Sequence, residues 1–283
     1  MTGKTVTNSV LDADIIRDYL STGGSGPGGS KTALKLEVHE CVVSTNDYVL
    51  ALAAQYSQNF FACIANQQTG GKGRNGAVWE SPPNASIYMS LGCYFERFSP
   101  AQLSGLSLAC GVCVARMLRG MGLKAQLKWP NDILLDYKKL AGILIETRAR
   151  SGGVYIVTGL GMNVDMPGQA AEKISQPWTD LCRALPAANG AIDRNRLVAQ
   201  LLEVLTDCCV EYNRSGFETF LDDWHGFDVL SGQRVVLNTG AGEKQAKVLG
   251  IDEDYGLRVE IKGVQKILYA ADIKLKLSDY AND

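Results

Sequence analysis

The residues best suited to chemistry lie in a glycine-rich run from Gln68 to Trp79, which holds four glycines and two cations. Glycine lets a backbone approach an anion closely and adopt positive φ, and successive N–H groups can form a nest around phosphate oxygens. Lys72 and Arg74 add full positive charge, and a guanidinium can bind a phosphate through two parallel hydrogen bonds. The run therefore predicts a mobile loop that closes over a small anionic ligand.

The glycine spacing of this run also fits two other phosphate-binding motifs in part. The spacing of the glycines over 71–76 fits a dinucleotide-binding fingerprint, but that motif must open a helix, and Pro82 and Pro83 follow instead. Val78 extends the match to the glycine loop of protein kinases, which also need His-Arg-Asp and Asp-Phe-Gly motifs that this chain lacks. A solvated flexible turn remains the alternative.

Further residues of interest occur in four short segments. Residues 44–46 read Ser-Thr-Asn, 128–132 read Lys-Trp-Pro-Asn-Asp, 139–146 read Lys-Leu-Ala-Gly-Ile-Leu-Ile-Glu, and 159–163 read Gly-Leu-Gly-Met-Asn. The first segment is a helix start, whose hydroxyls and free N–H groups either cap the helix or hold a polar ligand head. The glycines of the last segment either let a ligand pass or mark a bulge.

The elements that must position these segments follow from periodicity and turn signals. Helices are expected over 44–56, 99–121, 193–213 and 217–224, with a short one over 12–20. Strands are expected over 36–43, 60–65, 87–91, 126–128, 133–135, 139–148 and 154–163, the 87–91 strand being half-buried. Hairpin turns at 136–138 and 151–153 predict a largely antiparallel sheet, and 165–190 is expected to be irregular. Short β segments from residue 228 onward, at 235–237, 246–251, 257–261 and 266–269, predict a small β-barrel.

Composition sets further limits. The 283 residues carry a net charge of −2, with 46% hydrophobic and 20% charged residues, which suits a globular protein of one large and one small domain and gives no basic surplus for nucleic acid. No secretory signal or membrane span is evident. The eight cysteines indicate a reducing, cytoplasmic setting. We expect Cys110 and Cys113 to pack in a helix rather than bind zinc.

Taken in order, these segments resemble the biotin protein ligases, also called holocarboxylase synthetases, over roughly residues 36–275. The resemblance implies an α+β fold: a mixed, largely antiparallel sheet flanked by helices, like a class II synthetase, with a C-terminal SH3-like β-barrel. It implies a flexible segment over 1–32, a catalytic domain over 33–226 and a β domain over 227–283. Many members have arginine where Lys72 stands and a basic residue near Ala77. The expected type is monofunctional, because residues 1–32 are too few for a DNA-binding domain.

The resemblance also implies a reaction. Biotin and ATP, with Mg²⁺, would form biotinyl-5′-AMP, from which a lysine of a biotin carboxyl carrier domain takes the biotin. The catalytic residues would be Lys139, Arg74 and Asp132. Biotin would be bound by Ser44, Thr45, Asn46, Gln68, Lys72, Gly73, Arg74, Lys139, Gly142, Gly159 and Gly161. ATP would be bound by Gly71, Lys72, Arg74, Trp79, Lys128, Asn131, Lys139 and Asn163.

Several roles stay open at this stage. Lys139 is either the cation at the reacting centre or an exposed hairpin lysine, and Trp79 either covers adenine or belongs to the core. Magnesium would be held mainly by the phosphates of ATP. Asp132 is either an additional ligand of this ion or a base for the incoming lysine. Asn131 and Asn163 either contact nucleotide or end their segments. Alternative functions are a lipoate or octanoyl ligase, a biotin-sensing regulator, or an inactive binding protein; nucleic acid and membranes are not expected partners.

Overall fold

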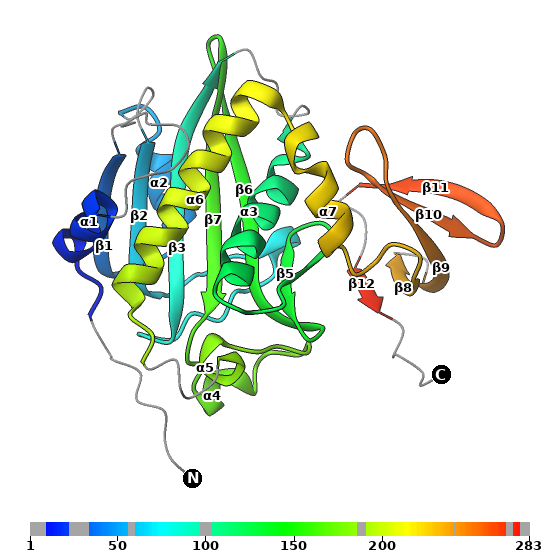
Figure 1. The fold of residues 1–283 in the computed structure, drawn as a ribbon, viewed down its shortest axis with the longest axis horizontal. Coiled ribbons are helices and arrows are strands. Elements are labelled where there is room, and N and C mark those ends of the chain that lie inside the picture. The colour runs from blue at the N-terminus through cyan, green and yellow to red at the C-terminus, as the bar shows by residue number, and fades with distance from the viewer. Residues whose placement is uncertain are drawn as a thin grey trace.

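The computed structural model describes residues 10–22, 34–55, 60–96, 103–185, 191–239, 242–269 and 274–277. A seven-stranded sheet forms its centre, in the order β1-β2-β3-β7-β6-β5-β4 (Figure 1). Its strands are β1 (Leu34–Val42), β2 (Phe60–Gln68), β3 (Ser86–Glu96), β4 (Gln126–Lys128), β5 (Asp132–Leu135), β6 (Lys138–Arg150) and β7 (Gly153–Asn163). β1 is parallel to β2, and the other neighbouring pairs of described strands in this sheet are antiparallel. The prediction of a largely antiparallel sheet is confirmed.

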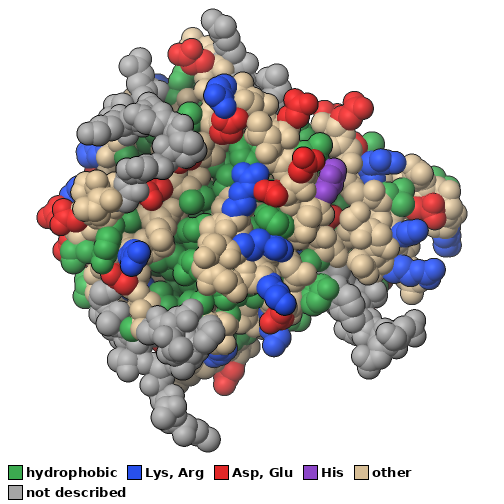
Figure 2. All heavy atoms as spheres, in the orientation of Figure 1, with side chains coloured by type: hydrophobic (Ala, Val, Ile, Leu, Met, Phe, Trp, Pro, Cys, Tyr) green, Lys and Arg blue, Asp and Glu red, His purple; other side chains and the backbone are tan. Residues whose placement is uncertain are grey.

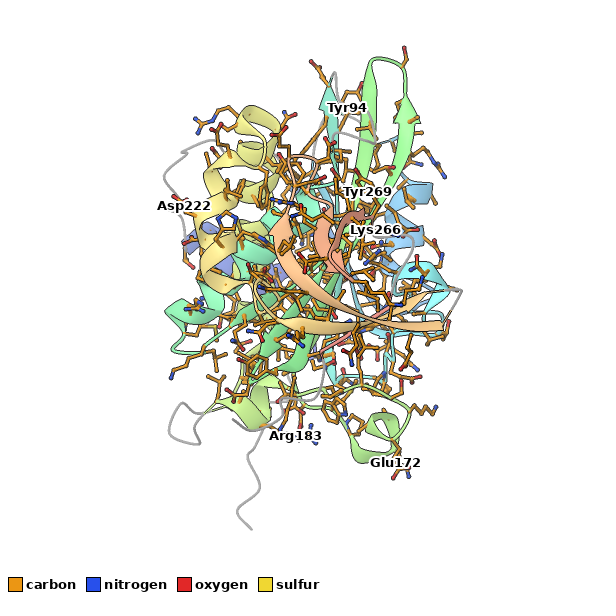
Figure 3. The ribbon with its side chains drawn as sticks, turned by 90° about the vertical axis from the view of Figure 1, so that its right-hand side faces the viewer. Tyr94, Glu172, Arg183, Asp222, Lys266 and Tyr269 are labelled. Atoms are coloured by element: carbon orange, nitrogen blue, oxygen red, sulfur yellow. The ribbon has the colours of Figure 1, made fainter. Side chains whose placement is uncertain are left out.

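Helices cover both faces of this sheet. One face packs against α3 (Leu106–Gly120) and α6 (Arg194–Ser215), which together form the main hydrophobic core. The opposite face carries α2 (Thr45–Ala51) over a smaller cluster that includes Phe61 and Tyr155. Figures 1 and 3 show α2 and α6 on opposite sides of the sheet. The remaining helices are α1 (Ala13–Thr22), α4 (Gly168–Ala171), α5 (Leu181–Ala184), α7 (Leu221–Phe227) and the 3₁₀ turns η1 (Arg74–Gly76) and η4 (Glu218–Phe220).

The helix ends show how local sequence fixes these elements. Ser44 caps α2 by accepting the Asp47 N–H at 3.4 Å. Asp193 caps α6 by accepting the N–H groups of Asn195 and Arg196, and Gly216 ends it at φ +66°. Both helices were predicted, although α2 ends about a turn earlier than expected. α3 begins at Leu106 rather than near residue 99; residues 97–102 lie outside the described part of the chain.

The two hairpins that bring the site segments together form at the predicted turns. Asp136 and Tyr137 both adopt positive φ between β5 and β6, the geometry of a tight type I′ connection, and Gly152 at φ +81° joins β6 to β7. The expected half-buried strand, β3, is instead buried on both faces along most of its length, because α2 covers the face opposite the main core. The irregular region 165–190 contains the short helices α4 and α5.

The C-terminal part is an open sheet rather than the expected SH3-like barrel. Its strands, β8 (Arg234–Thr239), β9 (Gly242–Ile251), β10 (Leu257–Ile261), β11 (Val264–Leu268) and β12 (Lys274–Leu277), have the order β11-β10-β9-β8-β12. The two end strands, β11 and β12, do not pair with each other in the described residues. No residue of β11 is fully buried, whereas β8, β9 and β10 bury residues in the main core.

The outer surface of the helical layer is held by charge and ring contacts. Arg116 of α3 forms an ion pair with Asp223 of α7, and the Arg119 guanidinium lies 4.1 Å from the centroid of the Phe227 ring. Figure 2 shows Lys and Arg side chains in blue along the middle of this face, interleaved with acidic ones in red. These contacts join α7, which leads into the C-terminal sheet, to α3.

Helix α1 lies inside the segment 1–32 that was expected to be flexible. It matches the short helix predicted over 12–20 and is docked on the main core, with Ile16 fully buried. The Tyr19 hydroxyl donates to Asp193 at 2.7 Å, and the Arg17 guanidinium donates to the Leu36 carbonyl at 2.9 Å. Residues 1–9 and 23–32 lie outside the described residues.

Candidate active site

The candidate site lies on the face of the sheet that carries α2. A single cross-strand row runs through Lys128, Asp132, Gly142, Gly161 and Tyr88, on β4, β5, β6, β7 and β3. Paired residues in such a row point to the same face. The two glycines leave a shallow floor in the middle, with charged residues at one end. Three segments distant in sequence thus meet at one place.

Trp79 occupies this floor. A Cβ at Gly161 would overlap the Trp79 indole, and one at Gly142 would approach its Cζ3 to 3.2 Å. Indole Nε1 is buried and has no hydrogen-bond partner among the described residues. Glycine at both positions is therefore what allows an aromatic ring to lie flat on the backbone, and the ring covers the position where the resemblance expects ligand.

Lys139 projects toward the same ring. Its Nζ lies 5.3 Å from the centroid of the Trp79 ring and 2.6 Å from Asp132 Oδ1. Both side chains of this ion pair are only 15% exposed. The reading of Lys139 as an exposed hairpin lysine is therefore wrong: the residue is a largely buried cation beside the floor.

Two further cations approach this ion pair. Burial lowers the pKa of Lys128; the Asp132 carboxylate opposes this effect and the Lys139 charge adds to it. Burial likewise lowers the pKa of Arg74, again opposed by Asp132. Asp132 thus acts electrostatically on Lys128 and Arg74 as well as pairing directly with Lys139. Such a concentration of positive charge favours an anionic ligand.

The other end of the site is a network of polar side chains. The Thr45 N–H and hydroxyl both donate to Gln68 Oε1, at 2.9 and 3.1 Å. Gln68 Nε2 in turn donates to Ser81, at 3.1 Å, and the Ser81 hydroxyl to the Trp79 carbonyl. The network ties the start of α2 to the end of β2 and to the glycine-rich loop.

Asn46 is fixed from three directions. Its Nδ2 donates to Glu146 Oε2 at 2.7 Å, and its Oδ1 lies 2.5 Å from the Ser90 hydroxyl. Gly159 lies directly beneath, because a Cβ at that position would overlap Asn46 Oδ1. Asn46 is almost fully buried, so its amide is oriented before any ligand arrives.

The glycine-rich loop forms a small hairpin of its own. Lys72 and Val78 form an antiparallel bridge, and the Gly73 N–H donates to the Ala77 carbonyl at 2.7 Å. Asn75 sits at φ 53° at the tip. Lys72 points away from the Lys139 cluster: its Nζ pairs with Asp47 Oδ1 of α2 at 2.6 Å, and this hydrogen bond raises its pKa. The mobility of the loop stays a prediction.

The two asparagines have structural partners. Asn131 Nδ2 donates to the Ile143 carbonyl at 2.7 Å, which anchors the 128–132 segment to β6. Asn163 Nδ2 donates to the Thr179 carbonyl at 3.0 Å, while its buried Oδ1 has no partner among the described residues. The side-chain amide of Asn131 thus bonds to the backbone of β6. The side-chain oxygen of Asn163 remains available as an acceptor for a ligand.

Four residues of the site escaped the sequence analysis: Asp47, Ser81, Ser90 and Glu146. Ser90 left a signal, since a polar residue in the apolar strand Met89-Ser90-Leu91 must find a buried partner. Asp47, Ser81 and Glu146 gave none, because their partners lie 25, 13 and 100 residues away. Within the described residues no group of three or more His, Cys, Asp or Glu side chains is arranged to hold a metal ion.

Comparison with known proteins bears on this geometry. Residues 38–163 match the model of the Biotin/lipoate A/B protein ligase family. The Bifunctional ligase/repressor BirA of Salmonella typhimurium is 33% identical over 95% of this chain and 80% of its own length. The chain belongs to this ligase family. A second member, the Biotin--[acetyl-CoA-carboxylase] ligase of Mycobacterium tuberculosis, is 30% identical over 96% of this chain and 98% of its own.

The family fold is also seen in solved structures. The biotin protein ligase of Aquifex aeolicus in complex with biotin and ATP superposes with a TM-score of 0.68 at 23% identity, covering 86% of this chain and 99% of that one. At this identity the likeness establishes the fold. None of the helices in the described parts of the chain is long and apolar enough to cross a membrane.

Proposed function

We propose that this member of the family is a biotin–protein ligase, which activates biotin with ATP and transfers it to a lysine of a biotin carboxyl carrier domain. One observation carries the proposal. The largely buried Lys139–Asp132 pair stands beside the glycine floor, with a polar network on one side and a basic loop on the other. This arrangement suits a ligand with a polar, uncharged head and a carboxylate tail that must meet a phosphate.

The first step joins two anions. The carboxylate of biotin attacks the α-phosphate of ATP, and pyrophosphate leaves with the electron pair of the broken P–O bond. Two unit charges about 4 Å apart repel by roughly 4 kcal/mol at an effective dielectric near 20, which is about three powers of ten in rate. Lys139, held at 15% exposure, is the cation we assign to this point, because a fixed charge in a partly dehydrated site needs no reorganisation.

The polar network is our assignment for the head of biotin. Thr45, Asn46 and Gln68 are buried or half-buried and already oriented by Ser90, Ser81 and Glu146. Ser44 caps the helix that carries them. Gly73 and Arg74 of the loop would close over the ligand, and Gly142, Gly159 and Gly161 leave room for the Trp79 and Asn46 side chains that would line its site.

Lys128, Arg74 and Trp79 are our assignment for the nucleotide, with Gly71 shaping the base of the loop. Magnesium would enter as part of MgATP, because the described residues offer no cluster that could hold the ion by themselves and Mg²⁺ is usually bound through substrate phosphates. Asp132 is engaged by Lys139, so we assign it first to holding that lysine. Lys72, paired with Asp47, is assigned to the loop rather than to a phosphate.

The decisive experiment is incubation of the protein with biotin, MgATP labelled at the α-phosphate, and a biotin carboxyl carrier domain. Labelled biotinyl-5′-AMP should form, and biotin should then appear on one lysine of the acceptor. Because the family also contains lipoate ligases, lipoate and octanoate should be offered in parallel. Adenylation of either acid in preference to biotin would overturn the assignment, and binding of biotin without adenylation would indicate an inactive binding protein.

A further inference from the structure

The turn between β9 and β10, residues 252–256, reaches from the C-terminal sheet to the segment that carries Lys128. Asp252 Oδ1 accepts the N–H groups of Asp254 and Gly256 at 3.1 and 2.7 Å, which stabilises the turn internally. Tyr255 sits at its tip with φ 63°, a conformation that L residues rarely adopt.

Tyr255 makes contacts outside its own sheet. Its carbonyl accepts the indole N–H of Trp129 at 3.0 Å. Its ring lies edge-on against Phe217, with centroids 4.8 Å apart, and fits over Gly105, where a Cβ would come within 2.8 Å of the ring. A hydrogen bond from the Ser104 hydroxyl to the Asp254 carbonyl, at 3.0 Å, fixes the same turn to the start of α3.

Trp129 is the residue next to Lys128, and the rest of its segment is fastened at three more points. The Val229 N–H donates to the Leu127 carbonyl at 3.0 Å, the Ser107 hydroxyl to the Pro130 carbonyl at 2.9 Å, and Asn131 Nδ2 to the Ile143 carbonyl. The contact at Trp129 comes from the C-terminal sheet, and the one at Leu127 comes from Val229, which precedes β8. The backbone next to Lys128 is therefore held in part by the turn that carries Tyr255.

We infer that Tyr255 is a positioning residue, through which the C-terminal sheet holds Lys128 against Asp132 and so sets the nucleotide end of the site. This inference rests on the proposed function for its kinetic consequences. The proposed biotin end is held by other elements: Thr45, Asn46 and Gln68 bond to one another and to residues of β3 and β6. Loosening the turn should thus weaken the use of MgATP and leave biotin affinity unchanged.

The test is biotin-dependent exchange between ATP and pyrophosphate, measured with the full-length protein alongside its affinity for biotin. Tyr255→Gly removes the ring and tolerates the positive φ. We expect kcat/KM for MgATP to fall at least tenfold, with the Kd for biotin within twofold of the wild type. Tyr255→Phe, which keeps the ring, should restore exchange. Exchange within twofold of wild type in Tyr255→Gly would overturn the inference, as would an equal loss of biotin affinity.

A matched control is available in the same sheet. Lys262 also has positive φ, at 51°, in the exposed turn between β10 and β11. Lys262→Gly makes the same backbone change away from Trp129, so it should match the wild type in both assays. Exchange lowered in Lys262→Gly as much as in Tyr255→Gly would show a general effect of the sheet and contradict a specific role for Tyr255.

A second measurement is independent of the reaction. Amide hydrogen exchange over residues 127–132 should be faster in Tyr255→Gly and in Trp129→Phe, which lacks the indole donor, than in the wild type. Unchanged protection of this segment in both variants would overturn the inference even if catalysis were altered. If the wild type failed to form any adenylate, the proposed function would be wrong. The amide hydrogen exchange data would still decide whether Tyr255 positions this segment.

Discussion

The neighbours of Lys139 determine its position and its environment. Asp132 holds its ammonium group at 2.6 Å, and Trp79 shields one side of it. Asp132 also acts electrostatically on Lys128 and Arg74. An anionic ligand entering beside these side chains would add to the compensation that Asp132 provides.

Replacing Lys139 with Met should lower adenylate formation by about a hundredfold or more, the usual effect of removing a fixed charge-stabilising donor. The measurement is biotin-dependent release of pyrophosphate. Because the change leaves Asp132 buried without this partner, the double variant Lys139→Met, Asp132→Asn serves as the control for stability. Near-normal pyrophosphate release by the single variant would show that another cation supplies the charge.

Lys128 should give the reaction an alkaline limit. Its pKa is lowered from 10.5, chiefly by burial, so the group loses its proton at a lower pH than an ordinary lysine does. If its charge binds the nucleotide, kcat/KM for MgATP should decline as pH rises through that lowered pKa. Lys128→Arg, which stays protonated, should move the decline to higher pH. An unchanged alkaline limb in this variant would remove Lys128 from the nucleotide site.

At the scale of elements, the glycine-rich loop is held down by contacts at both ends. Lys72 pairs with Asp47, and Trp79 lies on Gly142 and Gly161. Arg74 lies between these two contacts, and we assign it to holding the ligand. An acyl-adenylate reacts with water and with amines, so it must be retained until the acceptor lysine arrives.

Arg74→Gly should therefore still form biotinyl-adenylate but release it much faster. A charge-assisted and potentially bidentate contact is lost, while the loop becomes more costly to order. The rate of dissociation of preformed adenylate measures this directly, and transfer of biotin to serum albumin reports on escaped intermediate. Lys72→Gly also removes one charge and adds loop entropy, and it breaks the Asp47 contact as well, so release that is faster in Arg74→Gly than in Lys72→Gly is due to the lost contact with the adenylate. Slow release of the adenylate by Arg74→Gly, with no labelling of albumin, would contradict the proposal that Arg74 retains the intermediate.

The same elements show what could be predicted from the sequence. Turn chemistry at 136–138 and 151–153 predicted the hairpins, and helical spacing of Leu197, Leu201 and Leu205 predicted α6, because these signals are local. The partners of Asn46 were not predictable, since Ser90 and Glu146 are 44 and 100 residues away. Barrel closure failed as a prediction because alternating β segments do not reveal which strands pair at the edges.

At the scale of the whole molecule, the C-terminal sheet and the catalytic part share one core. Val235, Val248 and Leu257 belong to the same buried cluster as the residues of α3 and α6. Figure 3 shows this sheet in front of the main one, with Lys266 and Tyr269 on it. The sheet is therefore an integral support for one end of the site.

Deletion of residues 231–283 should lower the free energy of unfolding and impair ligation far more than biotin binding. Apolar surface of the shared core becomes exposed, and Trp129 loses its partner Tyr255, whereas the biotin pocket keeps its contacts. Denaturant unfolding, biotin titration and ligation assays on the shortened chain measure the three effects. A shortened protein that stays folded but no longer binds biotin would contradict the assignment of biotin binding to the residues before the C-terminal sheet.

The seat of Trp79 gives the protein a built-in optical reporter. Of the four tryptophans, Trp129 and Trp224 are buried far from solvent, and Trp178 lies over the Arg183 guanidinium. Trp79 alone rests on a floor of bare backbone beside an ammonium group, so a ligand entering the site must change its surroundings. Its emission should shift when biotin or MgATP is added, and Trp79→Phe should abolish that shift, so that binding at each end of the site can be timed in a stopped-flow fluorimeter without any added label.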